Sequence, residues 1–257
     1  LSLFRALCSI AGKDVQARTI SKGQRGRVTG SAAALGGGAT LLAGVILFLL
    51  GDLTISTMGI VLLVGASTWA IATWVFSHVE EPVPEGEQEG IDKSWWSDTW
   101  KLFTGDAQFR NFVIVRALLL VSALSTAFII LLHDDLSGIY GFVLASGLAS
   151  LVGGRVSGIF SDRSSKNTMA AGAAISSVII LLIVAGSHWA PDSVNAWVMP
   201  LGFFAVNLAH TAVRVARKTY VVDMAGGDKR TQYVGAANTM MGIILLIVGG
   251  ISSVIAL

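Results

Sequence analysis

The sequence has little charge for its length. Only 13% of its 257 residues are charged, 53% are hydrophobic, and the mean hydropathy is +0.71. Ordinary soluble domains carry roughly 25% charged residues, so the composition excludes a soluble fold with a polar shell. It also excludes intrinsic disorder, which requires the opposite balance. An integral membrane protein remains.

The sequence also lacks several features that other classes of protein function require. The single cysteine, Cys8, excludes a disulfide framework and a multi-cysteine metal site. The net charge of +2 is too small to argue for nucleic-acid binding. No phosphate-binding loop or hydrolase turn is present, and no two histidines are spaced as metal ligands. We therefore expect no enzyme, no cofactor and no metal. The four histidines are spread over loops and spans: His78, His133, His188 and His210.

Apolar runs set the fold class. A membrane-spanning helix needs about 20 mostly apolar residues, and seven runs qualify. The run Leu1–Gly12 is too short to cross and does not begin with Met, so we interpret the chain as a fragment that starts inside a helix. The expected class is an all-α integral membrane protein with seven full spans after a truncated first helix. The spans are Ala32–Leu50, Ile55–Phe76, Phe112–Leu132, Ile139–Phe160, Met169–Ser187, Ala196–Val213 and Val234–Leu257.

The basic residues occupy alternate stretches between the spans. The other stretches, around Asp52, Asp134 and Asp192, contain no Lys or Arg. Because cytoplasmic loops carry the excess of Lys and Arg, all basic stretches are predicted to be cytoplasmic. Their residues are Lys13, Arg18, Lys22, Arg25 and Arg27; Lys93, Lys101 and Arg110; Arg155, Arg163 and Lys166; and Arg214, Arg217, Lys218, Lys229 and Arg230.

An acidic, proline-containing stretch at 79–92 divides the chain, and a tryptophan-rich segment follows it. The stretch cannot bury apolar surface, so we expect a solvated linker. Trp96, Trp100 and Phe103 share one helix face, which favours a helix on the cytoplasmic membrane surface, with partner docking as the alternative. The predicted domains are residues 1–78, a linker region 79–110, and residues 111–257.

The sequence also contains an internal repeat. One constant shift superposes Lys13 on Lys218, Arg25 on Arg230, and Gly30 on Gly235. Each basic stretch follows a helix entering the cytoplasm and precedes one leaving it. Two halves of equal orientation joined by a cytoplasmic linker are typical of transporters.

The stretch from Gly158 to Asn167 resembles motif A of the major facilitator superfamily, Gly-x-x-x-Asp-Arg-x-Gly-Arg-Arg/Lys. Gly158, Asp162, Arg163 and Lys166 match, whereas Ser165 and Asn167 replace a glycine and a basic residue. The resemblance to the second-half copy of the motif implies an incomplete two-bundle fold. In this interpretation the chain holds helices four to eleven of twelve.

The resemblance also implies a gating contact at the cytoplasmic side. Asp162 would meet the N-terminus of the fifth helix near Gly30, and Gly30 and Gly158 would let the two backbones approach closely. Arg163 and Lys166 would face Asp14 or helix-end carbonyls of the other half. The alternative is a loop that only sets orientation.

The family's helices one, four, seven and ten line its cavity, which implies candidate substrate residues. Interhelical hydrogen bonds are the alternative role for the polar ones. Arg116 either snorkels to the cytoplasm or binds substrate or an ion-pair partner. His210 is a candidate for a coupling proton, and the proline of the antiporter signature is absent. The candidates are Asn207, His210, Ser122, Ser125, Thr126 and Arg116.

We therefore predict a secondary active transporter that moves a small, unidentified solute by alternating access. It is expected to be a monomer in a lipid bilayer, the inner (plasma) membrane of a bacterium, with its linker in the cytoplasm. The alternatives are a receptor-like, channel-like or structural membrane protein, and a fragment without transport activity.

Overall fold

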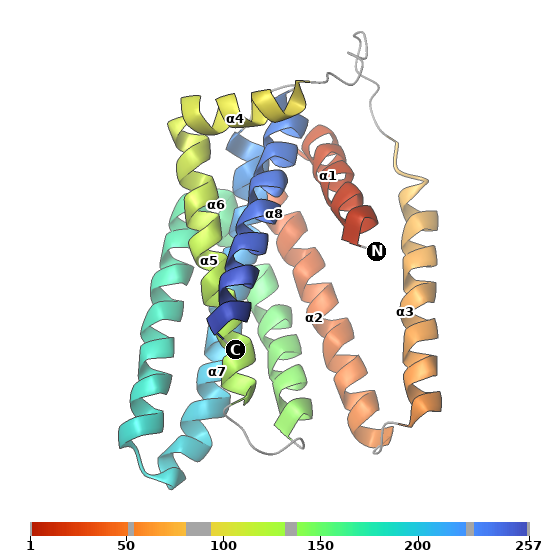
Figure 1. Ribbon diagram of the computed structural model, residues 1–257. Helices are drawn as coiled ribbons and strands as arrows, with labels where there is room; N and C mark the ends of the chain where they lie inside the picture. The colour runs from red at the N-terminus through yellow and green to blue at the C-terminus, as the bar shows by residue number, and fades with distance from the viewer. Residues whose placement is uncertain (1, 51–53, 81–93, 132–137, 225–228, 256–257) are drawn as a thin grey trace.

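The computed structural model describes residues 2–50, 54–80, 94–131, 138–224 and 229–255. These residues form helices joined by short turns, and most of the helices run side by side (Figure 1). The helices are α1 (Ser2–Thr19), α2 (Arg25–Leu50), α3 (Ile55–Phe76), α4 (Trp95–Gly105), α5 (Ala107–Leu131), α6 (Gly138–Trp189), α7 (Asp192–Met224) and α8 (Lys229–Ile255).

Five helices in the described ranges are long and apolar enough to cross a membrane: α2, α3, α6, α7 and α8. Their surfaces fit a lipid environment, because large apolar side chains such as Leu35, Phe48 and Leu62 are exposed along them. The all-helical membrane class predicted from the composition is confirmed. The span predicted at Ile55–Phe76 coincides with α3.

Helix α6 contains two of the predicted spans. Ser164 departs from helical geometry (φ −162°, ψ 99°), and the chain reverses direction there (Figure 1). The hydroxyl of Ser164 accepts a hydrogen bond from the backbone N–H of Asn167 at 3.2 Å, which caps the second half of α6. The predicted loop between these spans is therefore a break of one residue.

The helices at the basic end of the molecule are longer than predicted. The prediction ended the first helix at Gly12, but α1 continues to Thr19, and α2 begins at Arg25. A turn at Gly23, whose φ of 92° suits glycine, joins them. The prediction was wrong because apolar runs locate only the membrane-spanning part of a helix. Polar residues such as Lys13 and Gln16 are good helix formers and continue it.

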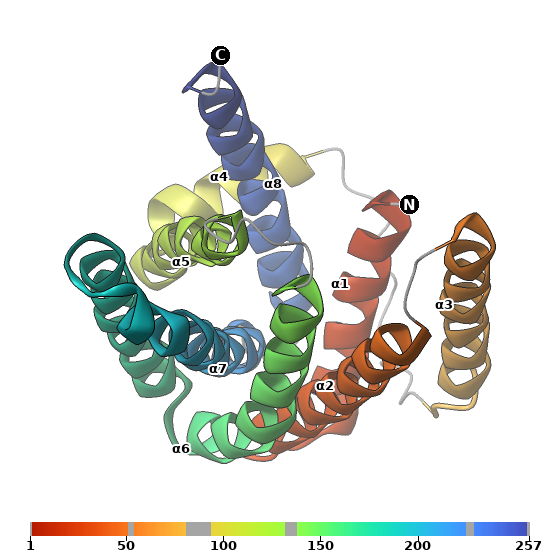
Figure 2. The ribbon, with the colours of Figure 1, turned by 90° about the horizontal axis from the view of Figure 1, so that it is seen from below.

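Two apolar clusters hold the helices together. The larger joins Phe109 and Val113 of α5 to Val222 of α7 and Ala237 of α8, and Ala17 of α1 packs into it. The smaller joins the two halves of α6 to α7. Seen along the helices, α2 lies beside the first half of α6, and α3 stands at the edge (Figure 2).

Helix α4 lies across the end of the molecule, roughly perpendicular to the other helices (Figure 1). Phe103 is half-buried against the larger cluster, while Trp96 and Trp100 are exposed. This arrangement fits the predicted interfacial helix. The acidic linker before it lies mostly outside the described residues, so the domain boundaries remain a prediction.

Asp106 connects α4 to α5. Its carboxylate accepts hydrogen bonds from the backbone N–H groups of Gln108 (2.8 Å) and Phe109 (3.0 Å), capping α5, and from the hydroxyl of Tyr233 on α8 (2.7 Å). The Tyr233 hydroxyl, followed by the N–H of Phe109, lowers the pKa of Asp106 below its ordinary value. The carboxylate thus fixes the start of α8 to the start of α5.

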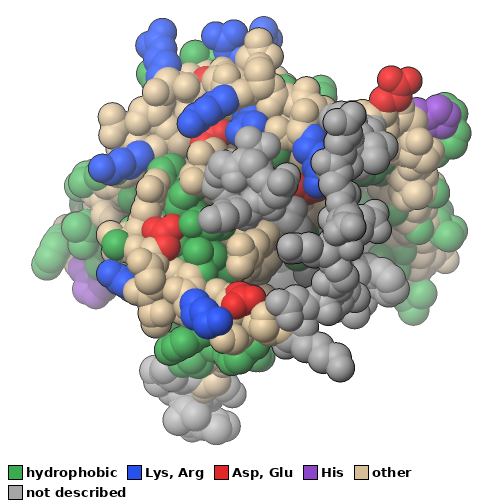
Figure 3. Space-filling model, turned by 90° about the horizontal axis from the view of Figure 1, so that it is seen from above, with side chains coloured by type: hydrophobic (Ala, Val, Ile, Leu, Met, Phe, Trp, Pro, Cys, Tyr) green, Lys and Arg blue, Asp and Glu red, His purple; other side chains and the backbone are tan. Residues whose placement is uncertain are grey.

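Lysine and arginine side chains gather on one end of the molecule, the face seen in Figure 3, which carries α4 at the top of Figure 1. We call this end the basic face. It contains the turn between α1 and α2 and the break in α6.

Candidate gating contact and cavity

Asp162 lies at the N-terminus of α2. Its Oδ1 accepts a hydrogen bond from the backbone N–H of Gly26 at 2.6 Å, and its Oδ2 accepts one from Arg27 at 3.0 Å. The side chain is only 6% exposed, and the Arg27 guanidinium lies 3.6 Å away. The first N–H groups of a helix have no partner within it, and they carry a partial positive charge. The carboxylate therefore binds where the helix end is most receptive to an anion.

The contact falls one turn before Gly30, the position expected from the sequence. Because α2 begins at Arg25, its unpaired N–H groups belong to Gly26 and Arg27. Gly30 instead contributes close packing. A Cβ added to Gly30 would come within 2.8 Å of the Cα of Gly158, and one added to Gly158 would come within 2.6 Å of the Gly26 carbonyl oxygen. Only glycine permits this approach of the two backbones.

The close packing continues along α2. A Cβ at Gly37 would be 2.7 Å from the carbonyl oxygen of Gly147. In contrast, a Cβ at Gly36 would meet nothing within 4 Å. Small residues on one face of α2 therefore fit the first half of α6 from the basic face into the membrane-spanning region.

Arg25 makes a second connection at the basic face. Its Nη1 lies 2.6 Å from Oδ1 of Asp223, near the end of α7. Its Nη2 donates to the carbonyl oxygen of Ala17 at 2.9 Å, and its Nε donates to that of Ile20 at 3.1 Å. The side chain is 5% exposed. One guanidinium thus caps the C-terminal end of α1 and ties it to α7.

The basic members of the motif are placed differently from expectation. Arg163 and Lys166 are exposed and form no ion pair within the described ranges. Asp14, expected opposite them, forms an ion pair with Arg18 at 2.9 Å. The difference follows from the longer α1, since Asp14 and Arg18 stand one turn apart on the same helix face.

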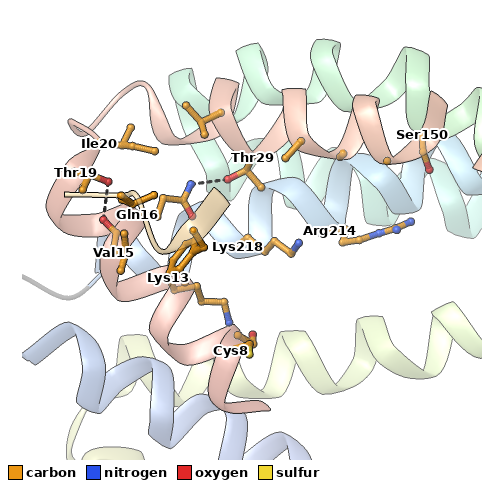
Figure 4. A pocket seen from close by; sticks show the side chains of 18 of the residues that line it. Cys8, Lys13, Val15, Gln16, Thr19, Ile20, Thr29, Ser150, Arg214 and Lys218 are labelled. Carbon is orange, nitrogen blue, oxygen red and sulfur yellow. Dashed lines mark hydrogen bonds between the residues drawn. The ribbon is translucent and has the colours of Figure 1, made fainter. Parts of the chain in front are cut away.

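A cavity of about 710 Å³ opens between α1, α2 and α7 (Figure 4). Lys13 of α1 and Arg214 and Lys218 of α7 line it, together with Gln16, Thr29 and Ser150. Gln16 Nε2 donates to the Thr29 hydroxyl at 2.8 Å, so the α1–α2 side of the cavity is held in place.

Three of the predicted cavity residues, Asn207, His210 and Arg116, are not among the residues that line this cavity. Asn207 donates to the Phe203 carbonyl within its own helix at 2.9 Å. His210 is half-buried near the charge of Arg214. Arg116 bonds to Asn238 Oδ1 of α8 at 3.1 Å, and its Nε is buried, so it does not simply snorkel to open water. The side chains of Ser122, Ser125 and Thr126 lie outside the described residues.

Sequence reasoning missed Lys13, Gln16 and Lys218 as lining residues. Lys13 and Lys218 were assigned to loops that only set orientation, because the apolar runs ended before them. The signal that could have found them is helical spacing. Lys13 and Gln16 are three residues apart and Arg214 and Lys218 four apart, so each pair shares one helix face.

In the ranges that the structure describes, no group of three or more His, Cys, Asp or Glu residues is arranged to hold a metal ion. A family model described as Major Facilitator Superfamily matches residues 1–250 of the chain. In the same comparisons, no curated protein and no solved structure matched the chain.

Proposed function

The chain belongs to the major facilitator superfamily, and from this we propose that it moves a small solute across the membrane by alternating access. Members of this family are membrane transporters, which makes a receptor, channel or structural role the weaker alternative. The finer proposal concerns the motion: α2 and the first half of α6 separate at the basic face and close again in each cycle.

The observation that carries this proposal is the Asp162 contact. One carboxylate holds two N–H groups at the start of α2, directly beside the glycine contact between Gly30 and Gly158. The contact joins segments far apart in the chain, on opposite sides of the acidic linker. It lies at the basic face, where we expect a gate to close the cytoplasmic side.

The strength of the contact suits a gate. A hydrogen bond to a charged group contributes about 1.5–3 kcal/mol net, and a charge at a helix N-terminus adds about 0.3–1 kcal/mol. A sum of a few kcal/mol favours the closed state, yet differential binding of a solute is enough to reverse it.

The test replaces Asp162 with Asn. The amide keeps one acceptor oxygen but turns an NH₂ group towards the second backbone N–H. We expect the closed state to lose about 1–2 kcal/mol, which shifts the open-to-closed ratio roughly 5- to 30-fold. Spin labels at Lys22→Cys and Asn167→Cys, in a Cys8→Ser background, report this ratio as short and long distances by pulsed electron resonance.

Asp98→Asn is the matched control, because this carboxylate lies on α4 and pairs with Lys101. It should leave the distance distribution unchanged. Equal distributions for Asp162→Asn and the parent protein would contradict the gating role. So would a single distance in every condition, with and without a membrane potential.

We place the basic face in the cytoplasm, because Lys and Arg are concentrated there. The bacterial inner membrane, action as a monomer and the coupling proton remain predictions. His210, beside the charge of Arg214, is the candidate carrier of that proton.

A further inference from the structure

Five cationic side chains converge in and beside the cavity. Lys13, Arg214 and Lys218 line it, and they extend from α1 and α7 towards the space between these helices (Figure 4). Arg116 and Arg217 lie close enough to Lys13 for their positive charges to repel its charge. The cluster, which we call the cation cluster, combines three helices: α1, α5 and α7.

The positive charges of the cation cluster are not balanced by carboxylates in the part of the chain that the structure describes. Within the described residues none of its five members forms an ion pair with a carboxylate. Two described carboxylates on the same helices pair with other basic residues. Asp14 pairs with Arg18, and Asp223 pairs with Arg25.

Among the described residues, Arg116 lacks a carboxylate partner and also a hydrogen-bond partner for one of its donors. Its Nη2 donates to Asn238, but its Nε is buried without a hydrogen-bond partner. A buried donor attached to a full charge is costly to leave unsatisfied. Arg116 also lies close enough to Lys13, which lines the cavity, for their charges to repel each other.

Orientation signals alone do not explain the cluster. Residues that set orientation need only lie near the membrane surface. Arg214 directly follows the predicted span Ala196–Val213 and lies about 15 Å along the axis from the end of α7 at Met224. A charged side chain that lies beside a cavity at the end of an apolar span is a candidate for a solute or ion pathway.

We propose that this cavity binds a small organic anion carrying carboxylate or phosphate groups, and that this anion is the transported solute. Arginine forks match both groups in a bidentate way, and lysine adds point charge. Gln16, Thr29 and Ser150 on the lining offer neutral hydrogen bonds to the rest of the molecule. The volume falls within the range of about 300–1,000 Å³ typical of small-molecule sites. The second clause of the proposal rests on the transport function proposed above.

The test measures binding to the purified protein by its shift in melting temperature. The probes are citrate for carboxylate, glucose 6-phosphate for phosphate, and glucose and choline as neutral and cationic comparisons, all at one ionic strength. We expect one or both anions to raise the melting temperature in a saturable way. Glucose and choline should leave it unchanged.

Variants locate the binding. Lys13→Gln and Arg214→Gln should each weaken anion binding at least tenfold, and Arg214→Lys should recover part of it by restoring the charge. Lys22→Gln, which removes an exposed cation from the α1–α2 turn, is the matched control and should bind as the parent does. Should a Gln variant not fold, the Arg214→Lys affinity relative to the parent decides whether the fork contacts the anion.

The outcomes separate the two proposals. If neither anion binds, or if the cluster variants bind as well as Lys22→Gln does, the anion proposal is overturned whatever the spin labels show. If anions bind at the cluster but the labels at positions 22 and 167 keep one distance, alternating access fails and anion binding stands. Uptake of the bound anion into vesicles, reduced by Arg214→Gln, would support both.

Discussion

Arg25 shows how one residue can connect three helices. It is the first residue of α2, it bonds to carbonyl oxygens at the end of α1, and it pairs with Asp223 of α7. Nothing in its sequence neighbourhood distinguishes it from Arg27, whose side chain is 66% exposed. The difference is burial. A nearly buried guanidinium must satisfy its donors inside the protein, and these carbonyls and the carboxylate do so.

Arg25→Gln should therefore destabilise the protein by about 3 kcal/mol, because it strands Asp223 and two helix-end carbonyls together. Asp223→Asn should also destabilise the protein, because it leaves the nearly buried Arg25 guanidinium without its counter-charge, but by less, since the Asn side chain still offers an acceptor oxygen. Thermal unfolding in detergent measures both. Arg18→Gln, which removes an exposed pair within α1, is the control and should cost about 0.3–0.5 kcal/mol. Equal losses for Arg25→Gln and Arg18→Gln would mean that the network does not stabilise the fold.

At the scale of elements, the contact between α2 and α6 depends on which glycines face the partner. Gly30 and Gly37 bring the backbone of α2 against α6, while Gly36 faces open space. Glycine in a helix costs roughly 0.5–1 kcal/mol relative to alanine. At Gly30 that cost is offset by close packing, and at Gly36 no contact offsets it.

Alanine substitutions should therefore have opposite effects at these two positions. Gly30→Ala pushes α2 away from Gly158 and should lower the melting temperature and lengthen the distance between labels at positions 22 and 167. Gly36→Ala should raise the melting temperature through helix propensity, with no change in that distance. Two substitutions with the same sign would refute the glycine contact as the cause of the close approach.

Across the whole molecule, the few charges divide into separate groups. One group occupies the basic face, one carboxylate and one guanidinium connect helices there, and three members of the cation cluster line the cavity. A membrane protein cannot place charge freely, so each group reports a separate physical constraint.

Orientation is tested by labelling single cysteines from either side of the membrane, in the Cys8→Ser background. Lys22→Cys and Asn167→Cys at the basic face should react with an impermeant maleimide only from the cytoplasmic side. Ser187→Cys, near the other end of the second half of α6, should react only from the outside. The opposite pattern would reverse the assigned orientation, and labelling of all three from one side would contradict the topology.

The sequence alone was sufficient for the membrane class, the family and nearly all the spans, because each depends on local composition or on short motifs. The resemblance to motif A also predicted that the Asp162 carboxylate meets the N-terminus of a helix. This prediction did not depend on the exact residue at which that helix begins. Sequence reasoning missed the polar extensions of α1 and α2, and so placed the contact at Gly30 and assigned Lys13 to a loop. Helix ends in water carry no hydrophobic pattern, so the sequence did not show where α1 ends and α2 begins.

Only the tertiary structure decided which charges meet. Lys13, Arg116 and Arg214 lie on three helices that are far apart in the chain, and each alone is typical of a residue that sets orientation. Their proximity depends on how α1, α5 and α7 pack together, which periodicity within one helix does not encode. The same holds for Arg25 and Asp223, whose pairing requires two helix ends to meet. Local patterns thus determined where the charges are, and packing determined what they face.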